Sequence, residues 1–201
     1  MARFNKKNLL SELEDRTELT RTSSSVFSRL ENNMLIKPHG PGQWSIAQIF
    51  EHLNISHAIY IQSILKKITH GPEVISEDYN SGWLGDWLYQ KMLPREDGTL
   101  VKLKTPPAFR PPFFIADGRD VMDRFNQQLD TLHDIFTNAA TKDIERNRVP
   151  LTTAKLLSVR VGDALRYMVA HNERHLSQAQ QLKRRMEESA GLFNNDRAAV
   201  K

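Results

Sequence analysis

The chain has 201 residues and contains no cysteine. This length predicts one domain with a sizeable core, and the missing thiols exclude disulfides, thiolate metal sites and a cysteine nucleophile. Hydrophobic residues make up 39% of the sequence and charged residues 26%. These fractions are typical of a globular protein and exclude a fibrous or fully disordered chain.

The charge of the chain is mildly positive, with 28 Lys and Arg against 24 Asp and Glu, a net charge of +4. A nucleic-acid-binding protein concentrates its positive charge on one face, whereas these basic residues are scattered. Lys183, Arg184 and Arg185 form a basic run that could bind phosphate, but the end of a solvated helix, where cations suit the helix dipole, is the favoured explanation. We therefore do not expect nucleic acid as a partner.

The N-terminus carries acidic residues before any apolar stretch, which excludes a signal peptide. The longest apolar runs have four residues, as at 58–61, far short of the roughly 20 of a membrane span. We expect a cytoplasmic protein with no membrane partner.

Two long segments in the first half of the chain carry helical periodicity. The first runs from about residue 8 to residue 32, with a weakly helical middle at 22–25. The second runs from Ser45 to about residue 69 and follows a loop rich in proline and glycine. Ser45 and Gln48 have the spacing of a capping box, so we expect the helix to begin there.

The stretch from residue 70 to residue 116 interrupts this pattern with six of the nine prolines. It also holds five tryptophan and phenylalanine residues, and aromatic residues are rare in disordered linkers. The sequence predicts an ordered crossover packed on the helices, with a short helix at about 83–93. Its aromatic residues, with Trp83 and Trp87 foremost, could roof a pocket, complete the core or form a dimer surface.

The second half of the chain predicts two further helices, from about 117 to 140 and from about 162 to 188. The fold class is therefore all-α, a four-helix bundle with a long, Pro- and aromatic-rich crossover between its second and third helices. We expect one domain over residues 1–190 and a flexible tail over 191–201. The spacing leaves open whether the second and third helices run parallel or antiparallel.

The most informative feature is a pair of histidines on the last helix, His171 and His175. Four residues advance a helix just past one turn, so both imidazoles lie on one face and could share one metal ion. The zincin pattern is excluded because Glu173 lies two residues after His171, on another face. His52, on the second helix between core-like neighbours, is the candidate third ligand. On geometry alone, a three-histidine metal site and three hydrogen-bonded core histidines are equally good interpretations.

Two sequence motifs resemble those of the DinB/YfiT-like metalloenzyme family. Residues 44–53, WSIAQIFEHL, resemble its helix-2 motif, and residues 165–178, LRYMVAHNERHLSQ, resemble its helix-4 motif. The prolines and Phe109 within 104–112 resemble the crossover of the DinB_2 branch. The resemblance spans roughly residues 9 to 188.

The resemblance implies a four-helix bundle that holds one divalent ion, nickel or zinc, on His52, His171 and His175. Characterised relatives include S-transferases that use bacillithiol or mycothiol, and many members form homodimers. The resemblance therefore implies a metal-dependent enzyme for small molecules, a thiol-dependent S-transferase or a hydrolase, with a low-molecular-weight thiol as a possible cofactor. The alternative is a non-catalytic helical binding or interaction module in which the ion only holds the helices together.

Three further side chains are candidates for lining the pocket at this site. Ser56 follows His52 by one turn, and Tyr167 and Gln178 lie on nearly the same stripe as His171. Ordinary packing between helices is the favoured alternative for all three. No residue presents itself as a general base, so the sequence assigns no catalytic residue.

Overall fold

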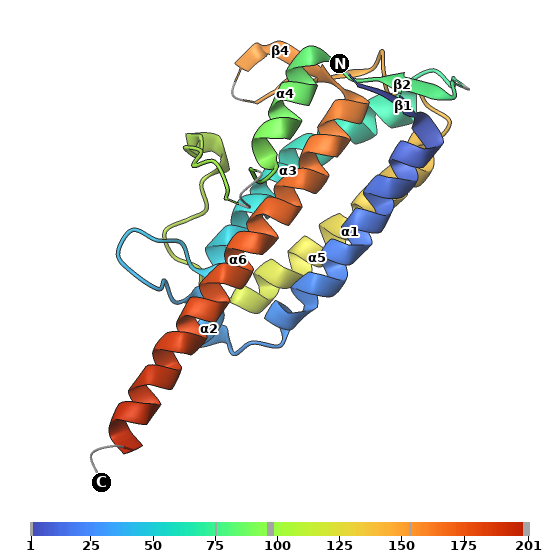
Figure 1. Cartoon of the computed structure of the whole chain (residues 1–201). Helices are drawn as coiled ribbons and strands as arrows, with labels where there is room; N and C mark the ends of the chain where they lie inside the picture. Colours follow the sequence, from blue (N-terminus) through green and yellow to red (C-terminus); the bar gives the residue numbers. More distant parts are fainter. Residues whose placement is uncertain (1, 75, 96–98, 153, 199–201) are drawn as a thin grey trace.

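A computed structural model describes residues 2–74, 76–95, 99–152 and 154–198, without the side chains of 155 and 190–198. Four long helices dominate the fold (Figure 1). They are α1 (Lys6–Ser28), α3 (Ile46–His70), α5 (Gly118–Ala139) and α6 (Val161–Ala198). Three short helical segments join them: α2 (Asn32–Ile36), α4 (Trp83–Met92) and the 3-10 turn η1 (Pro107–Phe109). The four long helices and the short helix at 83–92 were predicted, but α1 ends at Ser28, about four residues before its expected end, and α2 was not foreseen.

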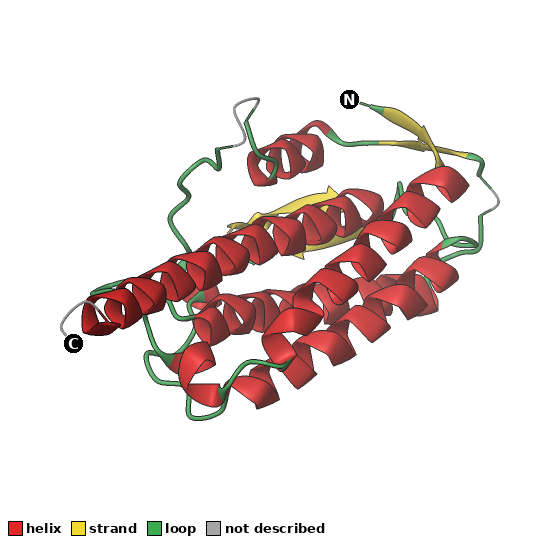
Figure 2. Ribbon diagram, turned by 60° about the horizontal axis from the view of Figure 1, so that its bottom comes forward, coloured by secondary structure: helices red, strands yellow, loops and turns green. Residues whose placement is uncertain are grey.

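Two small antiparallel sheets show that the all-α expectation was incomplete. β1 (Arg3–Asn5) pairs with β2 (Asp78–Asn80), and β3 (Arg148–Leu151) pairs with β4 (Ala154–Arg160). Figure 2 shows both pairs as short strands, one of them next to the N-terminus. The first pair could not be predicted from the sequence because β1 and β2 are each three residues long, too short for a periodic pattern, and lie far apart in the chain. Pro150 lies in β3 next to a change of register, and proline argues against a strand assignment.

The start of α3 follows the predicted capping box. The Ser45 side chain accepts a hydrogen bond from the Gln48 backbone at 3.2 Å, and the Ser45 N–H donates to the Gln48 side chain at 2.9 Å. Gln48 also donates to the carbonyl oxygens of Pro112 and Phe113, at 2.9 and 3.1 Å. One residue therefore caps the helix and ties the end of the crossover to it.

The contacts between helices settle the topology that spacing left open. Arg124 binds Glu51 near the start of α3, and Lys142 binds the Gly71 carbonyl just past its end. α3 and α5 therefore run parallel, while α1 and α6 run in the opposite direction, as Figure 1 shows. Since parallel neighbours cannot be joined by a short turn, the long connection at 71–117 is a geometric requirement.

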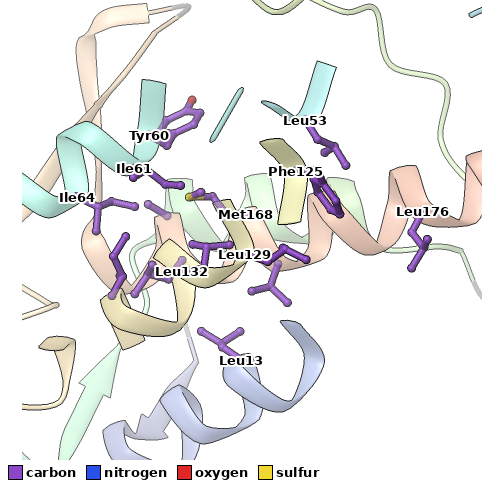
Figure 3. Close-up of a cluster of buried hydrophobic side chains, with 14 of the residues drawn as sticks. Leu13, Leu53, Tyr60, Ile61, Ile64, Phe125, Leu129, Leu132, Met168 and Leu176 are labelled. Atoms are coloured by element: carbon purple, nitrogen blue, oxygen red, sulfur yellow. The ribbon is translucent and has the colours of Figure 1, made fainter. Parts of the chain in front are cut away.

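The core lies between the four helices (Figure 3). Phe125 on α5 is fully buried, with its ring 4.9 Å from that of Phe50 and tilted edge-on to it. Leucines and isoleucines from all four long helices belong to the same core: Leu13, Leu53, Ile64, Leu129, Leu132 and Leu165. The apolar spacing seen in the sequence is therefore the contact surface of the bundle.

The crossover packs on the bundle less than its aromatic content predicted. Phe109 is buried, but Trp83, Trp87, Phe113 and Phe114 are all exposed, Phe113 completely. The expectation that these aromatic rings complete the core is therefore wrong for four of the five. The reason is that η1 presses only Phe109 against the bundle, where its ring stacks on Tyr60.

The last helix extends beyond its expected end near residue 188, since α6 reaches Ala198. The flexibility of the tail and the domain limit at residue 190 stay predictions, and residues 199–201 lie outside the described part. The homodimer also stays a prediction. None of the described helices is long and apolar enough to cross a membrane.

Candidate metal centre

Three histidines from two helices meet inside the bundle. His52 comes from α3, and His171 and His175 come from successive turns of α6, which runs antiparallel to α3. One nitrogen from each ring can be chosen so that all three lie within 4.8 Å of one another. Among the described residues, this is the one such group of three potential metal ligands. The structure thus brings together the three predicted residues.

The orientation of His52 is set by the crossover. Its Nδ1 lies 2.6 Å from the carbonyl oxygen of Phe109, and because a carbonyl can only accept, Nδ1 must carry the proton. The lone pair of Nε2 is then directed at His171, whose Nε2 lies 3.1 Å away. A hydrogen bond from the second nitrogen is the usual way to orient a metal-binding histidine.

All three imidazoles are buried, with exposed fractions of 4%, 5% and 7%. Burial lowers the pKa of His52, lowers that of His175 to about 3, and holds that of His171 well below its ordinary value. The neighbouring histidines and Arg174 depress the last two further, because each would be a second positive charge at the same place. The rings are therefore neutral at pH 7, the form that binds metals.

The polar atoms of this cluster are not satisfied by the chain itself. Nδ1 of His171 and Nδ1 of His175 are buried and make no hydrogen bond to any described residue. No carboxylate of the described residues forms an ion pair with the three rings. A set of neutral nitrogen donors with incomplete hydrogen bonding suits a borderline cation such as zinc or nickel. The residues present therefore fit a divalent ion.

A cavity of about 1060 Å³ adjoins the three histidines. Ser56, Tyr167 and Gln178 all line it, as do the rings of Trp44 and Tyr60. The Tyr167 ring stacks on His171 at 5.4 Å between centroids, and burial raises the pKa of its hydroxyl. Binding of a cofactor by Ser56, Tyr167 and Gln178 stays a prediction, but their places beside the cavity are those the helical spacing indicated.

The aromatic residues of the crossover divide between two places. Trp87 lines the large cavity, while Trp83 lines a separate, smaller depression bordered by β4. Of the two tryptophans for which a place over the pocket was one of three alternatives, Trp87 borders the pocket and Trp83 does not.

The fourth buried histidine, His57, does not join the cluster. Its Nε2 lies 2.7 Å from Oδ1 of Asn172, and burial lowers its pKa to about 4. This agrees with its position five residues after His52, on another face of α3. Glu173 likewise turns away from the histidines and binds Arg16 of α1 through two hydrogen bonds, at 2.8 and 2.7 Å.

Two groups at the site were missed by sequence reasoning. The carbonyl of Phe109 leaves no signal in a side-chain pattern. Arg174 lies directly before His175 in the motif, but whether an arginine has an acidic partner depends on contacts that only the fold supplies. Arg174 is 6% exposed, lines the cavity, and donates through Nη2 to the Val101 carbonyl.

Comparison with known proteins gives one structural neighbour and one family. No curated protein matches the sequence significantly. The solved structure of YfiT from Bacillus subtilis, described as a probable metal-dependent hydrolase with an unusual four-helix bundle topology, is similar at 17% identity. The match covers 90% of this chain and 87% of that chain, with a TM-score of 0.48. The sequence profile of the DinB superfamily, DinB_2, matches residues 16–179 and so includes all three histidines. This chain belongs to the DinB superfamily.

Proposed function

We propose that this protein is a divalent-metal-dependent enzyme acting on small molecules, with His52, His171 and His175 as the ligands of a nickel or zinc ion. The observation that carries the proposal is the position of three neutral imidazoles at the wall of a large cavity. Three protein ligands leave at least one position of the ion open, as in catalytic zinc sites.

The cavity favours a catalytic metal site over a structural site in which the ion only holds the helices together. A structural zinc site is closed by four protein ligands, whereas the three histidines adjoin a space large enough for a drug-sized molecule. Trp44, Tyr60 and Tyr167 supply apolar surface that would hold an organic substrate beside the ligands.

Thiol transfer is the reaction that the remaining residues favour. A bound divalent ion supplies positive charge that stabilises a thiolate or acidifies a bound water molecule. The chain has no cysteine, so a sulfur nucleophile must come from a low-molecular-weight thiol. Asp163, the one carboxylate among the described lining residues, accepts hydrogen bonds from Tyr79 Oη at 2.6 Å and the Gly82 N–H at 2.9 Å. It is thus engaged and is a poor general base for hydrolysis.

Metal binding is tested first, on protein purified without a histidine tag. We expect about one equivalent of nickel or zinc by elemental analysis, and little bound metal in His52→Ala and His171→Ala, because each change removes one of the three ligands. Glu173→Gln is the matched control, since Glu173 lies between the two histidines in sequence but binds Arg16. Wild-type protein with negligible metal, or equal metal in His171→Ala, would refute the site.

Activity is tested with metal-loaded protein, several low-molecular-weight thiols and 1-chloro-2,4-dinitrobenzene. In the expected reaction the thiolate sulfur forms a bond to the aromatic carbon, and chloride leaves. A parallel assay with p-nitrophenyl acetate reports hydrolysis. A thioether-forming rate no greater than that of His52→Ala would exclude the transferase, and ester cleavage alone would favour the hydrolase.

A further inference from the structure

Arg174 is a buried cation without a counter-ion in the described part of the chain. The residue is 6% exposed, its Nη1 makes no hydrogen bond to any described residue, and its Nη2 donates only to the Val101 carbonyl. No described carboxylate lies within ion-pair distance of it, although other arginines of the same helix, such as Arg166, have acidic partners. Burial of this kind is costly for a charge that lacks a partner.

The electrostatic surroundings of Arg174 also indicate that its charge has no partner. Burial lowers the pKa of its guanidinium, and the one group that acts in the opposite direction is the Tyr167 hydroxyl, which is neutral at pH 7. A structural arginine paired with a carboxylate behaves differently, as Arg16 shows: its hydrogen bonds to Glu173 raise its pKa. Arg174 is therefore electrostatically unsatisfied, and it faces the cavity that adjoins the histidines.

The cavity as a whole carries positive charge. Lys91, Lys102, Lys104 and Arg185 line it together with Arg174. The carboxylate of Asp163 is offset by Arg166, whose Nη1 lies 3.6 Å away. A positively charged cleft with apolar walls concentrates anions and orients them with their polar group toward the charge.

We propose that the cavity binds an amphipathic anion, and that Arg174 is the specificity-determining residue that pairs with its carboxylate or phosphate group. This inference rests on the proposed function, since it names the chemical class of the small molecule. The apolar body of the ligand lies against Trp44, Tyr60 and Trp87, while the lysines at the rim attract it from solution. Arg174 lines the same cavity as His171 and His175, so the bound anionic group shares that cavity with the proposed metal ligands.

The test compares 2-naphthoate with its neutral isostere 2-naphthamide by titration calorimetry. We expect the carboxylate to bind wild-type protein about tenfold more tightly or better, since a hydrogen bond to a charged group contributes that much. Arg174→Gln should remove the preference, and Arg174→Lys should keep part of it. The matched control is Arg184→Gln, the same change at an exposed arginine of α6 that does not line the cavity. 2-Naphthyl phosphate, titrated in parallel, distinguishes a phosphate site from a carboxylate site.

Affinities within about threefold of each other, undetectable binding of the carboxylate and the phosphate, or a preference kept in Arg174→Gln would each overturn the inference. The thermal midpoint of Arg174→Gln provides a second criterion. Removing an unpaired buried charge should change it little, whereas a fall of about 10 °C or more would reveal a structural ion pair and would also count against the inference.

Titrations of chelator-stripped and metal-loaded protein separate this inference from the proposed function. An anion preference that depends on Arg174 and persists in stripped protein supports the inference even if elemental analysis finds no metal. Bound metal without that dependence would leave the proposed function standing and refute the role of Arg174.

Discussion

Single residues decide what the site can bind. Some of them could be predicted from the sequence and others could not, for a physical reason. His52, His171 and His175 were identifiable because helical spacing and two motifs act within short stretches of chain. The unpaired state of Arg174 was not, because it depends on which acidic side chains the fold brings near. The same limit applies to the carbonyl of Phe109, which binds His52 from 57 residues away.

The contact between Glu173 and Arg16 gives a prediction at this scale. Glu173→Gln should lower the free energy of unfolding by about 1 kcal/mol, at the upper end for exposed pairs, because the guanidinium binds both carboxylate oxygens of Glu173. Urea unfolding at pH 7 measures the change.

The matched control for this prediction is Glu12→Gln. Glu12 meets the same arginine through one bond of 3.1 Å and is more exposed, with 59% of its side chain accessible. A loss for Glu12→Gln as large as that for Glu173→Gln would contradict the assignment.

Elements were predictable where they are long and periodic. α3, α4 and α5 begin and end within about two residues of expectation, because apolar stripes and caps are local signals. The strands were missed because their stability comes from a partner: β1 pairs with β2 across more than 70 residues, and β3 contains a proline. The aromatic residues of the crossover misled the prediction because composition does not specify which rings a surface loop buries.

The capping box of α3 gives a prediction for a whole element. Ser45→Ala should cost about 1 kcal/mol of folding free energy, since the backbone N–H of Gln48 loses its acceptor in a buried place. Thermal or urea unfolding measures it.

Ser63→Ala is the control within the same helix. The Ser63 hydroxyl bonds back to the Ile59 carbonyl four residues earlier, an interaction that does not stabilise a helix interior. Equal costs for the two substitutions would show that the cap contributes nothing of its own.

The whole molecule is held by one core that all four long helices share. Phe125 lies at its centre, fully buried between Phe50 and His57. Phe125→Ala should therefore destabilise the protein by about 3 to 5 kcal/mol, through lost burial and the cavity left behind.

Phe113→Ala is the same substitution at a fully exposed ring of the crossover, and it should change stability by no more than about 0.5 kcal/mol. Chemical denaturation of both variants gives the comparison. A marked loss for Phe113→Ala would mean that this ring is covered in solution, as in the predicted homodimer.

The crossover is attached to the site at two points, through the Phe109 carbonyl on His52 and the Val101 carbonyl on Arg174. A molecule that binds to these two side chains stabilises the arrangement of the segment in which both carbonyls contact them. By linkage, stabilising that arrangement in turn raises the affinity for the molecule. Occupancy of the site should therefore slow backbone amide hydrogen exchange across 99–110, a stretch that contributes no proposed metal ligand. The crossover connects two parallel helices, and the protection of its backbone amides would then report whether the site is occupied.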